Sequence, residues 1–300
     1  MRRIGLAVVL ALALGPLAAQ AQQGGRIPLV GVLRPSSPTD PVTEPFRQGL
    51  RDLGYVEGHN IRLVYRSAEG RYERLPGLAA ELVRLPVDVL VTDGPGALAA
   101  KDATTRIPIV FAHFAAPVEE GLVASLARPG GNVTGLSTLN RELAIKRLEL
   151  LEAVVPDLHR VAILWNTGRP GHAIQIKELQ AASARVGIRL EMLEVRSPLD
   201  FDNAFRTMVN KRVGAVTVLD DAMFANERSR LAALAAQSRL PAMYGNSVFA
   251  EAGGLISYGA IFRELHRRAA TDVDISKHVG RVKSERVLVS SLFVGGQFIS

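Results

Sequence analysis

The chain has 300 residues, of which 48% are hydrophobic and 5% aromatic, with a formal net charge of +7 and no cysteine. The absence of cysteine excludes disulfides, thiolate metal ligands and thiol catalysis. The basic residues are scattered and do not alternate with aromatic residues, so the charge does not indicate nucleic-acid binding.

The first residues have the pattern of a secretory signal peptide. Arg2 and Arg3 precede the apolar run IGLAVVLALALGPLAA, and Ala19-Gln20-Ala21 supplies the small residues of a cleavage site. The apolar run is shorter than the ~20 residues of a spanning helix and is followed by polar residues, which disfavours a permanent anchor. We therefore expect a signal peptide at 1–21 and a mature chain that is free in the periplasm.

From Pro28 onward, short apolar runs alternate with helical patterns, which is typical of parallel sheets covered by helices. The segments PFRQGLRDLG, YERLPGLAAELVRL and ELAIKRLELLEAVV carry apolar residues at helical spacing. A chain of this length usually forms more than one core, so we expect two lobes. The expected strands lie near Leu29–Leu33, Ile61–Tyr65, Val87–Thr92, Ile107–Ala112, Val133–Ser137, Val161–Trp165, Ile188–Val195, Ala215–Leu219 and Leu255–Tyr258.

Two parts of the chain repeat the same order of elements. The string IRL at 61–63 recurs at 188–190, and the strand pattern VLVTDG recurs later as VTVLDD. Asp93 and Asp220 thereby end equivalent strands, one in each lobe. We expect a first lobe of residues 22–130 plus 246–272, a second lobe of residues 131–245, and an atypical tail at 273–300, with crossings between lobes within 128–137 and 251–259.

The turn Gly94-Pro95-Gly96 stands between an apolar strand and an alanine-rich helix, and with Ala99 it satisfies a variant of the dinucleotide fingerprint. The turn follows the third strand rather than the first, and no acidic residue ends the next strand, so nucleotide binding is disfavoured. A helix N-terminus at a sheet edge offers N–H groups to a carboxylate or phosphate. An ordinary turn with solvated N–H groups is the alternative.

The sequence contains no motif of nucleophilic catalysis or metal binding. There is no G-x-S-x-G elbow, and the histidines show no metal-ligand spacing. His113 stands at a strand tip, where a pocket wall and an ordinary loop position are both compatible with the sequence. The other histidines are expected at the surface: His59, His159, His172, His266 and His278.

Polar residues at other strand tips are further candidates. Asp220 and Asp221 are adjacent, so we expect one to face the cleft and the other to cap the next helix. Trp165-Asn166-Thr167 suits ligand stacking and hydrogen bonding, although Trp165 packed between the lobes fits equally. The full candidate set for ligand binding is Ser36, Ser37, Asp93, Gly94, Pro95, Gly96, Ala97, His113, Trp165, Asn166, Thr167, Asp220, Tyr244 and Asn246.

Six long motifs occur in order between Ile27 and Ala270: FRQGLRDLGYVEGHNIRLVYRSAEGRYERLPGLAAELVRLPVDVLVT, GLVASLARPGGNVTGLS, KRLELLEAVVP, RVAILWN, VLDDAMF and EAGGLISYG. Together they resemble the ABC-transporter substrate-binding proteins of the tryptophan/tyrosine-type group. The resemblance implies the α/β fold of a type I periplasmic binding protein, with two doubly wound parallel-sheet lobes. It implies a non-catalytic, cofactor-free receptor that captures a small solute, such as an amino acid or a similar organic acid.

The same resemblance implies a monomer that delivers its solute to an ABC permease in the inner membrane, with the solute's anionic group at Gly94 to Ala97. The chain departs from the family at Ala116-Pro117, where an acidic DP is usual, and after Ala270. We expect the tail from about Thr271 to pack poorly and the C-terminal crossing element to be missing, as in a truncated copy, although RVLVSSLFV retains a strand pattern. The alternatives are an exported α/β enzyme using the same cleft and a ligand sensor for a membrane kinase.

Overall fold

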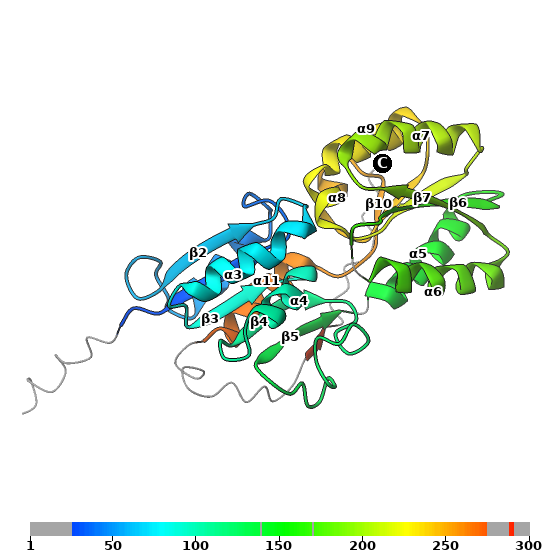
Figure 1. The fold of residues 1–300 in the computed structure, drawn as a ribbon. Coiled ribbons are helices and arrows are strands. Elements are labelled where there is room, and N and C mark those ends of the chain that lie inside the picture. Colours follow the sequence, from blue (N-terminus) through cyan, green and yellow to red (C-terminus); the bar gives the residue numbers. More distant parts are fainter. Residues whose placement is uncertain (1–25, 139, 170, 275–287, 291–300) are drawn as a thin grey trace, which may run out of the picture.

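The computed structural model describes residues 26–138, 140–169, 171–274 and 288–290, which form two α/β lobes, each built on a parallel sheet (Figure 1). The expected signal peptide lies outside these residues. The first sheet has the order β11-β5-β4-β3-β1-β2 and the second the order β10-β9-β8-β6-β7. The expected fold class of two parallel-sheet lobes is confirmed.

The strands of the first sheet are β1 (Leu29–Arg34), β2 (Arg62–Ser67), β3 (Val89–Thr92), β4 (Ile109–Phe114), β5 (Val133–Thr138) and β11 (Leu288–Ser290). Those of the second are β6 (Arg160–Asn166), β7 (Arg189–Val195), β8 (Ala215–Val218), β9 (Ala242–Tyr244) and β10 (Ile256–Ser257). The helices of the first lobe are α2 (Thr43–Asp52), the 3-10 helix η1 (Tyr72–Arg74), α3 (Leu75–Arg84), α4 (Pro95–Ala103) and α11 (Phe262–Asp272). Those of the second are α5 (Asn140–Val154), α6 (His172–Val186), the 3-10 helix η2 (Pro198–Asp200), α7 (Phe201–Asn210), α8 (Ala222–Asn226), α9 (Arg228–Gln237) and α10 (Val248–Glu251).

The central strands are buried on both faces, which explains why their sequences are continuous apolar runs rather than alternating patterns. In β1, Val30 and Val32 pack with residues of α2 and α11, whereas Leu29 and Leu33 pack with residues of α3 and α4. The second sheet is covered in the same way, by α5 and α6 on one face and by α7 to α10 on the other. Each sheet is therefore held rigidly, with its carboxyl edge facing the other lobe.

The boundaries of the lobes differ from those expected. β5 pairs with β4 in the first sheet, although residues from 131 onward were assigned to the second lobe. β10 pairs with β9 in the second sheet, although 246–272 was assigned to the first lobe. The glycines at 130 and 131 shape a loop inside the first lobe. The chain leaves the first lobe only beyond Thr138, at the end of β5, and returns to it only beyond Ser257, at the end of β10.

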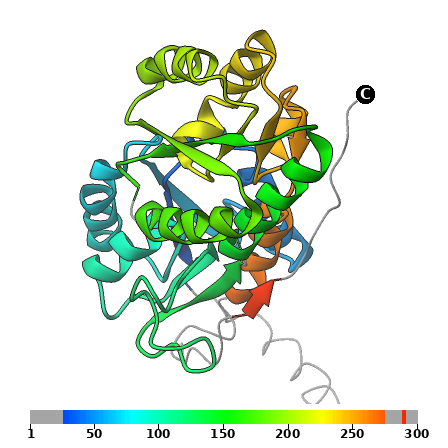
Figure 2. The same cartoon turned by 90° about the vertical axis from the view of Figure 1, so that its right-hand side faces the viewer.

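The tail is better packed than expected. Val273, just past the end of α11, is 1% exposed and lies in the same core cluster as residues of α2. Within RVLVSSLFV, residues Leu288–Ser290 form β11, which pairs with β5 at the edge of the first sheet (Figure 2). The remaining tail residues, 275–287 and 291–300, lie outside the described part of the chain, so the expected absence of a crossing element is untested there.

Candidate ligand-binding site

A cavity lies between the carboxyl edges of the two sheets. In the first lobe it is lined by residues at or after the ends of β1, β3, β4 and β5, and in the second by residues that follow β6, β8 and β9. Parallel strands end at a common edge, which is where open α/β sheets bind their ligands. The candidate residues that line the cavity are Ser36, Asp93, Gly94, Pro95, His113, Asp220 and Asn246.

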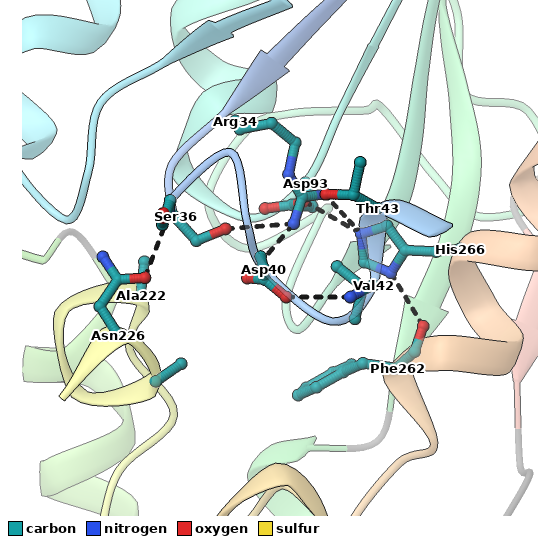
Figure 3. Close-up of polar contacts among 12 residues, drawn as sticks. Arg34, Ser36, Asp40, Val42, Thr43, Asp93, Ala222, Asn226, Phe262 and His266 are labelled. Carbon is teal, nitrogen blue, oxygen red and sulfur yellow. Dashed lines mark hydrogen bonds and ion pairs between the residues drawn. The ribbon is translucent and has the colours of Figure 1, made fainter. Parts of the chain in front are cut away.

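Arg34, the last residue of β1, is the centre of a buried polar cluster in the first-lobe wall (Figure 3). Its Nη1 lies 2.5 Å from Asp93 Oδ2 and 2.8 Å from His266 Nε2, and its Nη2 donates to Ser36 Oγ at 3.1 Å. Asp40 Oδ2 lies 3.4 Å from the same Nη2. Burial favours a raised pKa for Asp93, but the charge of Arg34 and the hydrogen bond from His266 outweigh it and hold the pKa below its usual range. The positive charge of Arg34 in this wall is thus already paired with the carboxylates of Asp93 and Asp40.

Asp93, His113 and His266 bring their possible metal-ligand atoms within 4.8 Å of one another. The guanidinium of Arg34 contacts both Asp93 and His266, so a positive charge already stands where a metal ion would bind. These three residues therefore do not fit a metal site. Burial lowers the pKa of His113 to about 3, which leaves a neutral ring against Phe262, with ring centroids 4.4 Å apart.

One of the two aspartates after β8 caps the next helix, as expected, and both aspartates line the cavity. The Asp221 carboxylate caps α8, because its Oδ1 accepts from the backbone N–H of Met223 at 2.8 Å. Burial raises the pKa of Asp221, and the charge of Arg169 offsets only part of the rise. Asp220 also lines the cavity, and its Oδ2 lies 3.8 Å from Nη2 of the fully buried Arg147.

Arg169 enters the cavity from the loop after β6 and is held by His172. Its Nη1 lies 3.2 Å from His172 Nε2, and the same ring nitrogen lies 3.2 Å from the backbone oxygen of Asp220. Burial and the charge of Arg169 lower the pKa of His172 to about 3, so the ring is neutral and its Nε2 accepts from Arg169. Among the described residues Arg169 forms no ion pair, and its Nε is buried without a hydrogen-bond partner. Arg169 and the backbone of Asp220 thus contact the same ring of the second lobe, and both residues line the cavity.

Aromatic rings form much of the rest of the wall. Phe114 of β4, Phe262 of α11 and Tyr72 of η1 line the cavity from the first lobe, and Phe249 of α10 lines it from the second. Rings from both lobes can enclose a flat apolar group when the lobes close.

The expected anion site at the glycine turn is not supported, because its N–H groups already donate within the backbone. Gly94 N donates to the His113 carbonyl, Gly96 N to the Asp93 carbonyl and Ala97 N to the Gly94 carbonyl, each at 3.0 Å. Pro95 has no N–H group. Gly96 is needed for another reason, since a Cβ there would lie 2.2 Å from Thr92 Oγ1. The turn shapes the cavity wall and does not offer free donors.

Several candidates lie outside the cavity: Ser37, Gly96, Ala97, Trp165, Asn166, Thr167 and Tyr244. Tyr244 stacks on Phe249 within the core of the second lobe, with ring centroids 4.4 Å apart. Trp165 packs against residues of α5 and α6 in the same lobe. It therefore has a packing role rather than a stacking role, but it packs within one lobe and not between the two lobes. Asn166 supports the site indirectly, because its amide donates to Asp221 Oδ2 at 3.2 Å.

Several residues that line the cavity were not among the candidates predicted from the sequence: Arg34, Tyr72, Arg169, His266 and the phenylalanines of the wall. Arg34 directly ends the strand LVGVLR, so the argument that selected Asp93 at a strand tip applies to it equally. His172 and His266 were expected at the surface but are 1% and 2% exposed. His266 and Phe262 come from α11 rather than from a strand tip, and no local pattern marks them.

A two-lobed chain with a charged and aromatic cavity at facing sheet edges is a solute-binding protein. Residues 36–278 match the family of ABC transporter substrate binding proteins, and the chain belongs to that family. Proteins of this family are typically non-enzymatic and act outside the cytoplasm. Within the described ranges, every helix is too short or too polar to span a bilayer.

Individual relatives agree with the family and the fold. The chain is 27% identical over 248 residues to a tyrosine-binding protein of Clostridioides difficile, and the matched region covers 81% of this chain and 71% of that protein. A conserved domain protein of Vibrio cholerae superposes with a TM-score of 0.81 at 27% identity, covering 89% and 90% of the two chains. The ABC domain from Streptococcus pneumonia in complex with L-Trp superposes with a TM-score of 0.79 at 24% identity, with the same coverage.

Proposed function

We propose that the protein is the periplasmic receptor of an ABC importer and binds an amino acid with an aromatic or other large apolar side chain between its lobes. The family match supports a transporter's substrate-binding protein, and a relative at 27% identity is named for tyrosine binding. The signal-peptide pattern supports export.

The observation that carries the proposal is that a basic residue, Arg169, and an acidic residue, Asp220, both line the cavity from the second lobe. Arg169 forms no ion pair within the described ranges, although its charge acts on the buried Asp221, and it lies against the same ring nitrogen as the backbone of Asp220. The α-carboxylate of an amino acid fits Arg169, because a guanidinium binds a carboxylate bidentately. Its ammonium fits Asp220, which also lines the cavity. Arg34 already forms ion pairs with Asp93 and Asp40, so it is a poorer partner for the carboxylate.

The rest of the wall fits the side chain of the solute. Phe114, Phe249, Phe262 and Tyr72 line the cavity from both lobes. Aromatic side chains bury large areas and pack favourably with other rings. Closure around such a solute is a shift in population toward the closed arrangement, which the permease then recognises.

A thermal-shift screen of the purified mature protein tests the proposal. L-tryptophan, L-tyrosine and L-phenylalanine are each compared with the corresponding amine and deaminated acid, and L-alanine is the control for the side chain. We expect only the aromatic zwitterions to raise the midpoint, with ~2.7 kcal/mol of added stability at 100 times the dissociation constant. Stabilisation by the deaminated acids alone would show an anion site and contradict the proposal.

Delivery to a permease is tested separately by uptake of the radiolabelled amino acid in cells with and without this gene. We expect uptake to fall when the gene is deleted. Binding in vitro together with unchanged uptake would favour the ligand sensor over the importer.

A further inference from the structure

The segment Asp221–Asn226, at and within α8, holds the second lobe against two loops of the first lobe. The Tyr72 hydroxyl donates to Asp221 Oδ2 at 2.8 Å and accepts from the backbone N–H of Ala222 at 2.9 Å. In addition, the Ser37 N–H donates to Asn226 Oδ1 at 3.1 Å (Figure 3). These hydrogen bonds all cross from one lobe to the other.

Gly70 brings the backbones of the two lobes together beside Tyr72. It has a φ of +82°, and a Cβ at this position would lie 2.9 Å from Met223 Cα. Because that neighbour is backbone and cannot turn away, a side chain at Gly70 would hold α8 away from the first lobe. The close approach of α8 therefore depends on glycine here.

Tyr72 also lines two cavities. One is the ligand-binding cavity, and the other is a second cavity between the lobes that is lined by Glu69, Arg71, Asn166, Ser197 and Asn226, among others. Glu69 and Arg71 are exposed, so the second cavity opens toward solvent, whereas Tyr72 is buried. Tyr72 is thus a buried residue shared by the walls of the ligand-binding cavity and of a cavity that is open to solvent.

We propose that Tyr72 is the gate of the ligand-binding cavity. Its ring closes the passage from the second cavity, and its hydroxyl acts as a latch through its hydrogen bonds to Asp221 and Ala222 of the opposite lobe. Release of the solute is then faster when both hydrogen bonds break and Tyr72 moves away from α8. This inference rests on the proposed function, since it assigns the step that limits release from the same cavity.

The matched test compares Tyr72→Phe with Tyr244→Phe. Both remove one buried tyrosine hydroxyl, but that of Tyr244 has no hydrogen-bond partner among the described residues and lies in the core of one lobe. With L-tryptophan as the probe, we expect Tyr72→Phe to release it roughly 10- to 100-fold faster than wild type, as the loss of two hydrogen bonds implies. Tyr244→Phe is expected to release it at the wild-type rate. Equal rates in the two variants would overturn the gate.

A second readout does not depend on the ligand. The N–H of Ala222 donates to Tyr72, so its hydrogen exchange without solute is expected to be faster in Tyr72→Phe than in wild type or Tyr244→Phe. Unchanged exchange would overturn the latch. If wild type fails to bind L-tryptophan while the exchange difference is observed, the choice of solute is wrong and the latch stands.

Discussion

Replacing Asp220 by asparagine removes one negative charge from the second-lobe wall and keeps the shape of the side chain. The proposed role of this carboxylate is to receive the solute's ammonium. Loss of one partner of a desolvated charge pair costs ~2–5 kcal/mol. The dissociation constant for a zwitterionic ligand should therefore rise by roughly 30-fold to a few thousand-fold.

We also expect Asp220→Asn to lower the free energy of unfolding, because Asp220 lies beside the buried Arg147. Removal of one partner from a buried ion pair costs ~3–5 kcal/mol when the pair is tight. Here the two atoms are 3.8 Å apart, and Arg147 Nη1 still donates to the Tyr258 carbonyl at 3.0 Å. We therefore expect Asp220→Asn to lower the free energy of unfolding by only ~1–3 kcal/mol.

The double variant Arg147→Met with Asp220→Asn separates binding from folding. It removes both charges, so we expect it to recover part of the lost stability without recovering the affinity. Chemical denaturation gives the stability of each variant, and isothermal titration calorimetry gives the affinity at a temperature where all are folded. Wild-type affinity in Asp220→Asn, or full recovery of affinity in the double variant, would remove Asp220 from the ligand site.

Three further substitutions test the roles of Arg169, Gly96 and His172. Arg169→Met should weaken binding of the zwitterion by at least about 10-fold in calorimetry, and wild-type affinity in this variant would refute a carboxylate contact. Gly96→Val should lower the unfolding free energy by ~1–3 kcal/mol even without ligand, because the new Cβ would overlap with Thr92 Oγ1. An unchanged denaturation midpoint would show that the turn shifts to accommodate the side chain. His172, with a pKa of about 3 in the folded chain and 6.5 as the ordinary value, contributes stability that is full above pH 6.5 and is lost as the pH falls toward 3. His172→Gln should therefore flatten the fall of unfolding free energy in this range by up to ~1.4 kcal/mol per pH unit, and an identical pH profile would show that His172 is not buried as a neutral ring.

The apolar runs were sufficient to predict the sheets, because strands that are buried on both faces must be apolar along their whole length. The same argument placed Asp93 and Asp220 at strand ends that face the cavity, as the structure shows. β9 was missed because it has only three residues, AMY, too few for a periodic pattern. The lobe boundaries were wrong because glycines mark loops as readily within a lobe as between lobes.

The chemistry of the glycine turn could not be predicted from the sequence. Gly94-Pro95-Gly96 has the composition of an anion-binding turn, but whether its N–H groups are free depends on nearby carbonyls, including that of His113 on another strand. The contribution of α11 was hidden for a similar reason. Its residue His266 reaches Arg34 and Asp93 only because the chain returns to the first lobe after β10.

The proposed function requires that the cavity between the lobes binds an aromatic amino acid as a zwitterion. The most direct measurement is isothermal titration calorimetry of the mature wild-type protein with L-tryptophan, L-tyrosine and L-phenylalanine. We predict binding of one molecule per chain for at least one of the three, with no binding of its deaminated analogue at the same concentration. The absence of a binding heat for all three at several temperatures, or equal affinity for the deaminated analogue, would contradict the account.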